Sequence, residues 1–503
     1  MQAMLRRAAV IAALLFPGGA VAQDITLIAR EGGIVLSGSL QGFDGEFYRI
    51  DTSYGPLTVD AQGVICEGPA CPDMIAPKAT LRFVGAPDAG VALIPPLFAA
   101  FAQSRGLTYT LIEGANYAAR ISDPETAKTL ADISFTPAGP DEAAASLTAG
   151  RAEFIIAARA EKPFGTRTIA MDALVPVMAA DNPTPQVSTV DLARALSGEA
   201  DNWAQIGGPD MPIVLHALAP DTDLQRALSD RLGAPIKADR VHPDLASLAA
   251  AVAKDPWALA ITGRAARGAA RLLPLTDSCG FPLLATALAV KAEDYPLALP
   301  LYLLTPPRRM SLFAREFLEF VGTPEAQGVI AAAGYVDRSI TRQPMTADGL
   351  RLINAIQGAG EDVSLADLKR LVDLMDGADR LSLTFRFEDG AATLDANSRE
   401  NLIDLARLIA AGQFRDLSLV LAGFSDGSGA AAANFDLSRT RAEGVLAALR
   451  LAAPDLAEAV LPRVEAFGEA LPMACDSTAA GRELNRRVEL WVKPAFAVPP
   501  SPL

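Results

Sequence analysis

The sequence predicts an α/β protein of several domains: a small all-β module, a larger α/β module and a C-terminal module with the order β-α-β-α-β-β. Short alternating segments broken by Gly-Gly, Asp-Gly and Gly-Pro fill residues 24–73, which indicates strands. Strands alternate with helical stretches over residues 78–342, which is typical of a mostly parallel sheet with crossover helices. A chain of 503 residues is also too long for one ordinary core, so several folded modules are expected.

The composition is that of a globular protein, with half of the residues apolar and a fifth charged. The 44 basic and 59 acidic residues give a net charge of −15. A field of that sign repels polyanions, and the sequence has no basic run that would override it. We therefore expect no nucleic-acid partner.

Residues 1–22 have the layout of a secretory signal peptide. Arg6 and Arg7 precede the apolar stretch 8–16, and Ala20-Val21-Ala22 forms a small-residue cleavage site before Gln23. No cysteine stands at the cut, which argues against a lipid anchor. No later run of 18 apolar residues follows, so the mature chain is expected to be exported and to have no transmembrane segment.

Residues 23–77 form the predicted small β module, and we expect it to act as a packing or spacer domain. Cys66 and Cys71 stand five positions apart around a Gly-Pro pair, close enough for a disulfide in an oxidising compartment. A metal site is the alternative, but it would need more ligands. The only histidines, His216 and His242, do not neighbour a cysteine, so the disulfide is favoured and no metal is predicted.

The other two cysteines, Cys279 and Cys475, fall in different predicted domains. We expect each to be an unpaired thiol in a core or a loop. Nothing in the sequence indicates a cofactor.

Residues 78–345 form the predicted α/β module. Its segments resemble the phosphate-binding periplasmic component of ABC transporters, and the matching phrases occur in the family's order at residues 146–163, 169–183, 192–213, 295–307 and 317–336. The resemblance implies two α/β lobes joined by a hinge. It also implies an oxyanion site built from hydroxyl-bearing turns at helix N-termini, where free N–H groups and the helix dipole favour negative charge.

The turns that would hold the anion depart from the family's pattern. Gly85-Ala86-Pro87-Asp88 has lost the hydroxyls and gained a carboxylate, and Thr222 stands between Asp221 and Asp223. Arg159 matches an arginine that the family places near its ligand, so Arg159 and Thr222 are the candidate anion-binding residues. The alternative role for Arg159 is to cap a helix or to bridge the lobes.

Residues 346–380 form a polar connector with Leu365, Leu368, Leu371 and Val372 at helical spacing, which predicts a linker helix packed on a neighbour. Residues 495–503 are proline-rich and are predicted to be a disordered tail.

The C-terminal module covers residues 381–494. Strict alternation puts Leu381, Leu383, Phe385 and Phe387 on one face of the first strand. The remaining elements are predicted as helices at about 397–411 and 435–450 and strands at 417–423, 463–468 and 486–492. One sheet covered by two helices is expected.

Three phrases follow in order in this module: GFSDGSG (423–429), NFDLSRTRA (434–442) and GRELNRRV (481–488). They resemble the motif of the OmpA-like peptidoglycan-binding domain. Phe424 stands where that motif has histidine, and Ser425 keeps a hydroxyl where threonine is usual.

The resemblance implies that Asp426 takes the ammonium of the diaminopimelate residue in a wall stem peptide and that Arg441 takes its carboxylate. Ser425 and Asn434 belong to the same expected peptidoglycan site. An arginine fork suits a carboxylate, since it can donate two parallel hydrogen bonds. The alternative is a structural Asp–Arg ion pair. The basic and amide residues of the third phrase are expected to be mainly structural, namely Arg482, Asn485, Arg486 and Arg487.

No catalytic constellation is present in the sequence, so an enzyme is not predicted. The expected function is that of a non-enzymatic cell-envelope protein of a Gram-negative type, which binds peptidoglycan through its OmpA-like domain and carries a solute-binding-protein-like module. The alternative is a component of phosphate or other oxyanion uptake, which adds a small anionic solute as a second candidate partner. The expected location is the periplasm, in association with the cell wall, with the outer membrane as a further candidate.

Overall fold

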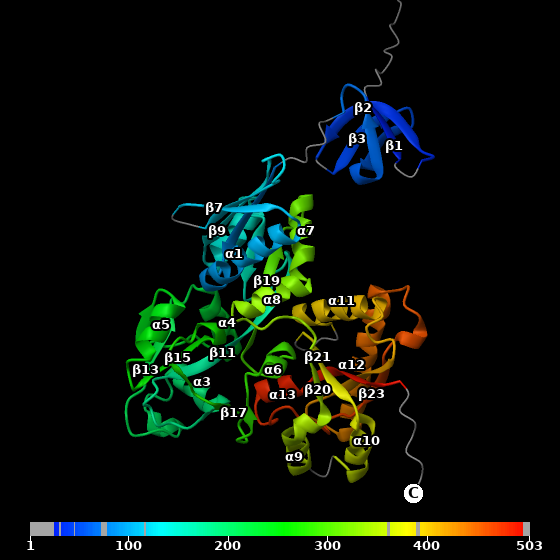
Figure 1. The fold of residues 1–503 in the computed structure, drawn as a ribbon. Helices are drawn as coiled ribbons and strands as arrows, with labels where there is room; N and C mark the ends of the chain where they lie inside the picture. The colour runs from blue at the N-terminus through cyan, green and yellow to red at the C-terminus, as the bar shows by residue number, and fades with distance from the viewer. Residues whose placement is uncertain are drawn as a thin grey trace, which may run out of the picture. The chain divides into compact units, whose positions relative to one another are not determined.

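The computed structural model describes residues 25–29, 32–44, 46–71, 78–114, 117–359, 363–388 and 393–495 (Figure 1). The predicted signal peptide (1–22) and residues 496–503 of the predicted tail lie outside the described residues, as do residues 72–77 before the predicted α/β module. The chain divides into two compact units, Met1–Ala79 and Thr80–Leu503. The domain boundaries expected within the second unit stay predictions.

The first unit is an antiparallel sheet with the strand order β4-β3-β2-β1-β5. Its strands are β1 (Ile25–Ala29), β2 (Val35–Phe43), β3 (Phe47–Thr52), β4 (Gly55–Asp60) and β5 (Val64–Glu67). Side chains alternate along β3, where Tyr48 and Ile50 are buried against Leu27 while Arg49 is exposed. A disulfide joins Cys66 to Cys71. The predicted all-β module is confirmed.

The second unit begins with an α/β region whose large sheet has the order β14-β13-β15-β11-β19-β10-β6-β9-β8-β7, with β16 beside β11. The strands of this sheet are β6 (Ala79–Gly85), β7 (Thr108–Ile112), β8 (Ala118–Ser122), β9 (Thr129–Pro137), β10 (Phe154–Ala157), β11 (Gly165–Met178), β13 (Val214–Leu218), β14 (Arg240–His242), β15 (Ala258–Gly263), β16 (Arg271–Leu272) and β19 (Ala298–Thr305). A small sheet joins β12 (Val187–Ser188), β17 (Leu275–Thr276) and β18 (Pro282–Leu283).

The helices of this region are α1 (Pro87–Ser104), α2 (Pro140–Thr148), α3 (Thr189–Ser197), α4 (Asp223–Leu232), α5 (Leu245–Val252), α6 (Ala287–Lys291), α7 (Leu312–Val321) and α8 (Pro324–Ala332). Two lobes share the long strand β11, because its first part pairs with β19 and its second part pairs with β15. Helix α1 packs on the lobe that contains β7 and β9, and α5 packs on the lobe that contains β13 and β15 (Figure 1). The predicted two-lobed α/β fold is confirmed, but the expectation of a mostly parallel sheet is wrong. Strand β10 is parallel to β6, and β13 is parallel to β14 and β15, but the other described pairings of this sheet are antiparallel, because β11 and β19 run against their neighbours and β7, β8 and β9 form a meander.

The C-terminal sheet has the order β20-β21-β24-β22-β23. Its strands are β20 (Arg342–Pro344), β21 (Asp379–Phe385), β22 (Leu417–Phe424), β23 (Arg463–Ala466) and β24 (Arg487–Pro494). Its helices are α11 (Ala396–Ala410), α12 (Ala431–Ala452) and the short α13 (Ala479–Asn485). Leu381, Leu383 and Phe385 are buried in one core cluster with residues of α11 and α12, as their alternation predicts. The predicted β-α-β-α-β-β order is confirmed, and α13 is an addition.

The connector covers the other face of this sheet. It contains two helices, α9 (Gly349–Gly358) and α10 (Leu365–Met375), rather than one. Leu371 and Met375 of α10 are buried against Phe424 of β22 and Trp491 of β24. The side chains of Phe424 and Trp491 point to the face of the sheet opposite α11 and α12. The prediction that Leu365 and Leu371 lie on one packed face of the connector is partly wrong, since Leu371 is buried but Leu365 is 68% exposed.

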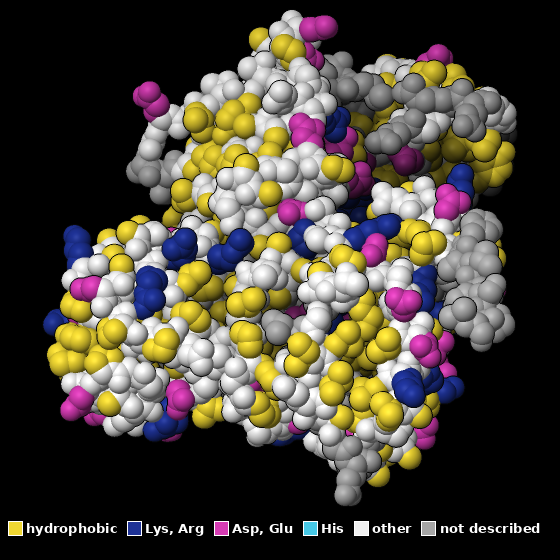
Figure 2. All heavy atoms as spheres, turned by 60° about the horizontal axis from the view of Figure 1, so that its bottom comes forward, with side chains coloured by type: hydrophobic (Ala, Val, Ile, Leu, Met, Phe, Trp, Pro, Cys, Tyr) yellow, Lys and Arg dark blue, Asp and Glu magenta, His cyan; other side chains and the backbone are white. Residues whose placement is uncertain are grey.

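The surface carries charges of both signs. On the face drawn in Figure 2, Lys and Arg side chains are interspersed with Asp and Glu side chains and do not form one continuous basic tract. Among the described helices, none is long and apolar enough to cross a membrane.

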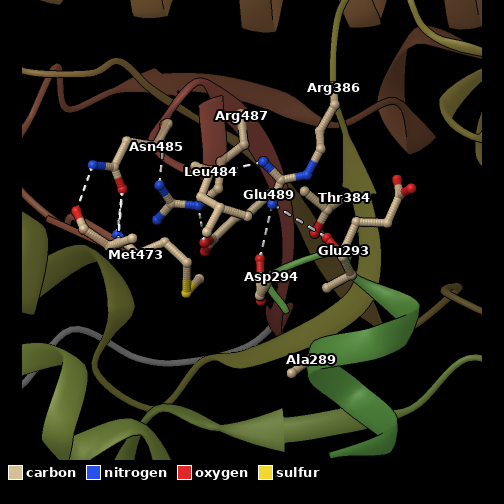
Figure 3. A network of polar contacts seen from close by, with 12 residues as sticks. Ala289, Glu293, Asp294, Thr384, Arg386, Met473, Leu484, Asn485, Arg487 and Glu489 are labelled. Carbon is tan, nitrogen blue, oxygen red and sulfur yellow. Dashed lines mark hydrogen bonds and ion pairs between the residues drawn. The ribbon is translucent and has the colours of Figure 1, made fainter. Parts of the chain in front are cut away.

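Buried ions lie where the α/β region contacts the C-terminal sheet (Figure 3). Asp294, just after α6, pairs with Arg380 of β21 at 2.7 Å and with Arg386 at 3.2 Å. Glu489 of β24 accepts from Arg487 at 2.7 Å and lies 3.5 Å from Arg380. Arg380 is 1% exposed and Glu489 is fully buried. A buried charge is tolerated only when it is paired, so each partner depends on the others.

Cys279 and Cys475 form a disulfide with a Cα–Cα distance of 5.8 Å, so the expectation of two unpaired thiols is wrong. The two cysteines are 196 positions apart in the sequence, and they meet because folding brings the loop after β17 against the loop before α13. Hydrogen bonds accompany the disulfide: Cys475 N donates to Asp277 at 2.9 Å, and the hydroxyls of Ser278 and Ser477 lie 2.6 Å apart. The α/β region and the C-terminal module are therefore linked both covalently and by ions.

We predict that Glu489→Gln lowers the free energy of unfolding by about 3–5 kcal/mol, because it leaves buried arginines without their counter-charge. Burial would raise the pKa of Glu489, but the charges of Arg351, Arg380 and Arg487 hold that pKa well below its usual range. A carboxyl with a lowered pKa contributes stability that is present above its unfolded pKa, about 4.3, and is lost as the pH falls further. Urea unfolding at neutral and acid pH measures both effects.

Glu458→Gln is the matched control for this prediction. Glu458 pairs with Arg450 at 2.8 Å, but its side chain is 75% exposed, so its replacement should change stability little. Equal losses of unfolding free energy in Glu489→Gln and Glu458→Gln would contradict a dominant role for the buried ions.

Candidate functional site

The candidate site lies at one end of the C-terminal sheet. Strands β22 and β23 are parallel and β24 is antiparallel to β22, so the ends of β22 and β23 meet the start of β24. Asp426 follows β22, Gly468 follows β23 and Arg486 precedes β24. Gly423 permits the close approach of α12 to β22, because a Cβ atom there would lie 2.1 Å from the carbonyl oxygen of Ser438. Residues distant in the sequence thus converge on the turn GFSDGSG.

Asp426 is held by its own turn and by the third motif phrase. Its carboxylate accepts from Arg486 Nη1 at 3.1 Å and from the backbone N–H of Ser428 at 3.0 Å. Partial burial would raise its pKa, but these hydrogen bonds and the charge of Arg486 keep the pKa of Asp426 below its ordinary value. The group is therefore a fixed anion at neutral pH.

Arg441 lies on α12, and its Nη1 atom is buried without a hydrogen-bond partner among the described residues. The guanidinium lies 5.8 Å from the centre of the Phe387 ring. Burial and the charge of Arg486 lower its pKa, and the charge of Asp426 opposes them. An arginine keeps its proton nonetheless, so Arg441 is a cation with an unused donor.

Two other predicted residues also have buried polar atoms without a partner in the described structure, namely Ser425 Oγ and Asn434 Nδ2. Ser425 is 3% exposed and Asn434 is 4% exposed. The great majority of buried polar atoms in proteins have a hydrogen-bond partner, and an unpaired one needs an explanation. Three of the four predicted peptidoglycan residues thus retain hydrogen-bonding capacity.

Arg486, expected to be mainly structural, pairs with Asp426, whereas Asp476 was not identified from the sequence. Asp476 accepts from the backbone N–H of Gly427 at 2.7 Å and from Asn485 at 2.6 Å, so it fixes the turn. Phe424 is buried under the Arg487 guanidinium, 4.4 Å from the ring centre. At the position where the motif has histidine, this chain therefore has a packed aromatic ring. Arg486, the second arginine of the phrase GRELNRRV (481–488), was the sequence feature that could have indicated this pairing.

Arg441 and Arg486 face a cavity of about 940 Å³. Its other wall comes from the α/β region and includes Arg159, Asp230 and Glu293. The structure therefore brings Arg159 and Arg441, which were predicted for two separate sites, to one cavity. Glu293 hydrogen-bonds Asn397 Nδ2 at 3.0 Å. Burial, followed by the nearby charge of Asp395, raises the pKa of Glu293 to about 7.

The predicted anion site between the lobes has a different geometry. Thr222 Oγ1 donates to the carbonyl oxygen of Ala219 at 2.8 Å, and Arg159 pairs with Asp230 at 3.0 Å. The buried carboxyl of Asp223 accepts the backbone N–H of Ala158, a donor of the kind that an oxyanion would use. Only about 30 Å³ remains open beside these residues.

Two further features lie in this region. Arg226 of α4 makes a two-pronged ion pair with Asp141 of α2, at 2.8 and 2.7 Å, which ties one lobe to the other. Gly85 has a φ of +125°, and a Cβ atom there would lie 2.2 Å from the carbonyl oxygen of Ile156. In the described part of the chain, no group of three or more His, Cys, Asp or Glu side chains could hold a metal ion.

Comparisons with known proteins support both predicted resemblances. The model of the OmpA family matches residues 386–486, and that of a PBP superfamily domain matches residues 124–325. The chain is 31% identical over 108 residues to the probable lipoprotein YiaD of Escherichia coli (strain K12), which covers 22% of this chain and 47% of that protein. The chain thus spans about half the length of this curated relative.

Solved structures similar to the chain include two bacterial phosphate-transport proteins. One is a putative phosphate ABC transporter substrate-binding protein from Clostridium perfringens, at 15% identity, with 51% of this chain and 99% of that chain covered and a TM-score of 0.42. The other is an ABC-type phosphate transport receptor from Vibrio cholerae, at 17% identity, with the same coverage and a TM-score of 0.41. The chain combines an OmpA family domain with a PBP superfamily domain.

We predict that phosphate neither produces binding heat nor raises the melting temperature of this protein. The carboxyl of Asp223 already takes the N–H of Ala158, and its negative charge repels an oxyanion that would use the same donor. Isothermal titration calorimetry and thermal melting with phosphate measure both quantities. A saturable heat accompanied by thermal stabilisation would contradict this reading of the region.

We predict that Glu293→Gln stabilises the protein more at about pH 8 than at about pH 5. A carboxyl whose folded pKa is raised contributes stability that is fully present below its unfolded pKa and is lost as the pH rises through the folded pKa, here about 7. Wild type should therefore lose stability over this interval relative to the variant. Melting temperatures at the two pH values measure it, and Glu142→Gln, on the exposed face of α2, should follow wild type.

Proposed function

We propose that this protein is a non-enzymatic cell-envelope protein that binds peptidoglycan non-covalently through its OmpA family domain. The observation that carries the proposal is Arg441, a cation with a buried, unused donor in the described structure, on the helix that follows the fixed anion Asp426. An amino acid zwitterion needs one anion and one cation of this kind. The diaminopimelate residue of a wall stem peptide provides the matching charges.

In the proposed complex, Asp426 binds the ammonium of diaminopimelate and Arg441 its carboxylate. Ser425 and Asn434 supply further hydrogen bonds from atoms that lack a partner among the described residues. Each charge-assisted bond contributes roughly 1.5–3 kcal/mol, so a single site binds weakly after the cost of association is subtracted. A wall with repeated stem peptides offsets this weakness through multivalency.

The PBP superfamily domain is, in this proposal, a periplasmic module held against the wall-binding domain. Oxyanion uptake is the less favoured function, because the carboxyl of Asp223 occupies the N–H donor of Ala158. The probable lipoprotein relative and the two matched families support an envelope location. Association with the wall in the periplasm, after export, follows from the same proposal.

We predict that Asp426→Ala and Arg441→Ala each weaken binding to purified diaminopimelate-type peptidoglycan by about tenfold or more, as expected for the loss of one charge-assisted contact. Co-sedimentation with insoluble peptidoglycan over a range of concentrations measures the bound fraction. Far-UV circular dichroism and thermal melting establish that each variant is folded.

Arg439→Ala is the matched control, since Arg439 lies on the same helix but is exposed and stacks on Phe435, with 5.2 Å from its guanidinium carbon to the ring centre. It should bind like wild type. Wild-type co-sedimentation of both Asp426→Ala and Arg441→Ala would refute the proposed site.

A further inference from the structure

The cation of the proposed wall site faces a cavity shared with the α/β region. Leu437, Thr440, Arg441 and Gly444 line it from α12, at the spacing of one helical face. Helices α3 and α4 and residues 295–298 form the opposite wall. A ligand that reaches Arg441 along this face therefore also meets the PBP superfamily domain.

The opposite wall is held in place. Arg338 donates to Asn397 at 2.9 Å and to Asp404 at 2.7 Å, both on α11. Arg167 of β11 pairs with Glu400 at 2.8 Å. With the buried pair of Asp294 and Arg380 and the disulfide of Cys279, these contacts make the cavity a built feature of the fold.

One part of the cavity is acidic and is assembled from both domains. Glu293 comes from the α/β region and Asp395 from the N-terminus of α11, and both line the cavity. Arg231 and Arg386 face the same space, and Arg386 is engaged by Asp294. Glu293 has a φ of +55°, a backbone conformation that residues other than glycine seldom adopt and that is enriched at functional sites.

The size and chemistry of the cavity suit a short peptide. Its volume of about 940 Å³ lies in the range of ligand pockets, roughly 300–1,000 Å³. Apolar side chains such as Leu192, Leu228 and Leu297 line it between groups of both charges. Arg159 and Asp230 are 45% and 59% exposed, which gives the cavity a polar opening.

We propose that this cavity binds a short wall-derived peptide with a free amino terminus, released from the glycan strand. The carboxylate of the diaminopimelate end lies at Arg441, and the terminal ammonium lies at Glu293 and Asp395, all of which line the cavity. This inference rests on the proposed peptidoglycan function and narrows its ligand from the polymer to a soluble stem peptide. Burial raises the pKa of both carboxyls, and the charge of Asp395 adds to this at Glu293, so a cation that arrives beside them stabilises their charged forms.

The probe is a soluble diaminopimelate-containing tetrapeptide, titrated calorimetrically into the full chain, together with the same peptide acetylated at its amino terminus. We expect wild type to bind the free peptide about tenfold more tightly than the acetylated one, because acetylation removes the ammonium. Glu293→Gln should reduce that ratio to near one. Equal affinities of wild type for the two peptides would overturn the placement of the amino terminus.

A second arm fills the cavity from the α/β side. Ala193→Trp places a large ring into it from α3 and should weaken binding of the free peptide about tenfold or more, whereas Val190→Trp, on the same helix but outside the cavity, should bind like wild type. Thermal melting reports whether each variant folds. If Ala193→Trp does not fold, the comparison of the free and the acetylated peptide on wild type tests the cavity inference by itself.

The two proposals fail in different ways. If insoluble peptidoglycan is bound in a manner that depends on Arg441, while Ala193→Trp affects neither the polymer nor the soluble peptide, the cavity inference is overturned and the wall-binding function stands. If neither the polymer nor the peptide binds, the wall-binding function itself is refuted, and the cavity inference with it.

Discussion

The pairing of Asp294 with Arg380 and Arg386 is the interaction on which the rest of the second unit depends. A carboxylate of the α/β region is placed among arginines of the C-terminal sheet, where Glu489 supplies the second negative charge (Figure 3). Neither set of charges could be buried alone, because an unpaired ion in a protein interior costs several kcal/mol. The two parts of the chain therefore stabilise each other only when docked, and the docking has a defined geometry.

That geometry creates the cavity and determines what Arg441 faces. On an isolated OmpA family domain, the face of α12 that carries Arg441 would have no second wall, whereas here α3 and α4 provide one. Arg441 lines this cavity, and its buried Nη1 has no partner in the described structure. The proposed ligand site is thus a property of the docked pair, and a mutation that loosens the ion cluster should disturb binding as well as stability.

The two regions predicted to bind an anionic group differ in whether their hydrogen-bond donors are already satisfied. Between the lobes, the protein satisfies its own donor, since the carboxyl of Asp223 takes the N–H of Ala158. At the end of the C-terminal sheet, the donor of Arg441 is left unused. A site that is already satisfied gains little from a ligand, whereas an unsatisfied one gains the full hydrogen bond. This contrast favours wall binding over oxyanion uptake.

The sequence by itself determined the elements of the C-terminal domain and the identity of the charged residues on its turn and helix. Alternation in LSLTFRF and the fixed spacing from Asp426 to Arg441 are local properties, and local periodicity and turn chemistry suffice to predict them. Only the tertiary structure decided that Asp426 pairs with Arg486, that Cys279 meets Cys475, and that a second domain closes the cavity. These contacts join residues 60 to about 200 positions apart, and no local pattern encodes such distances.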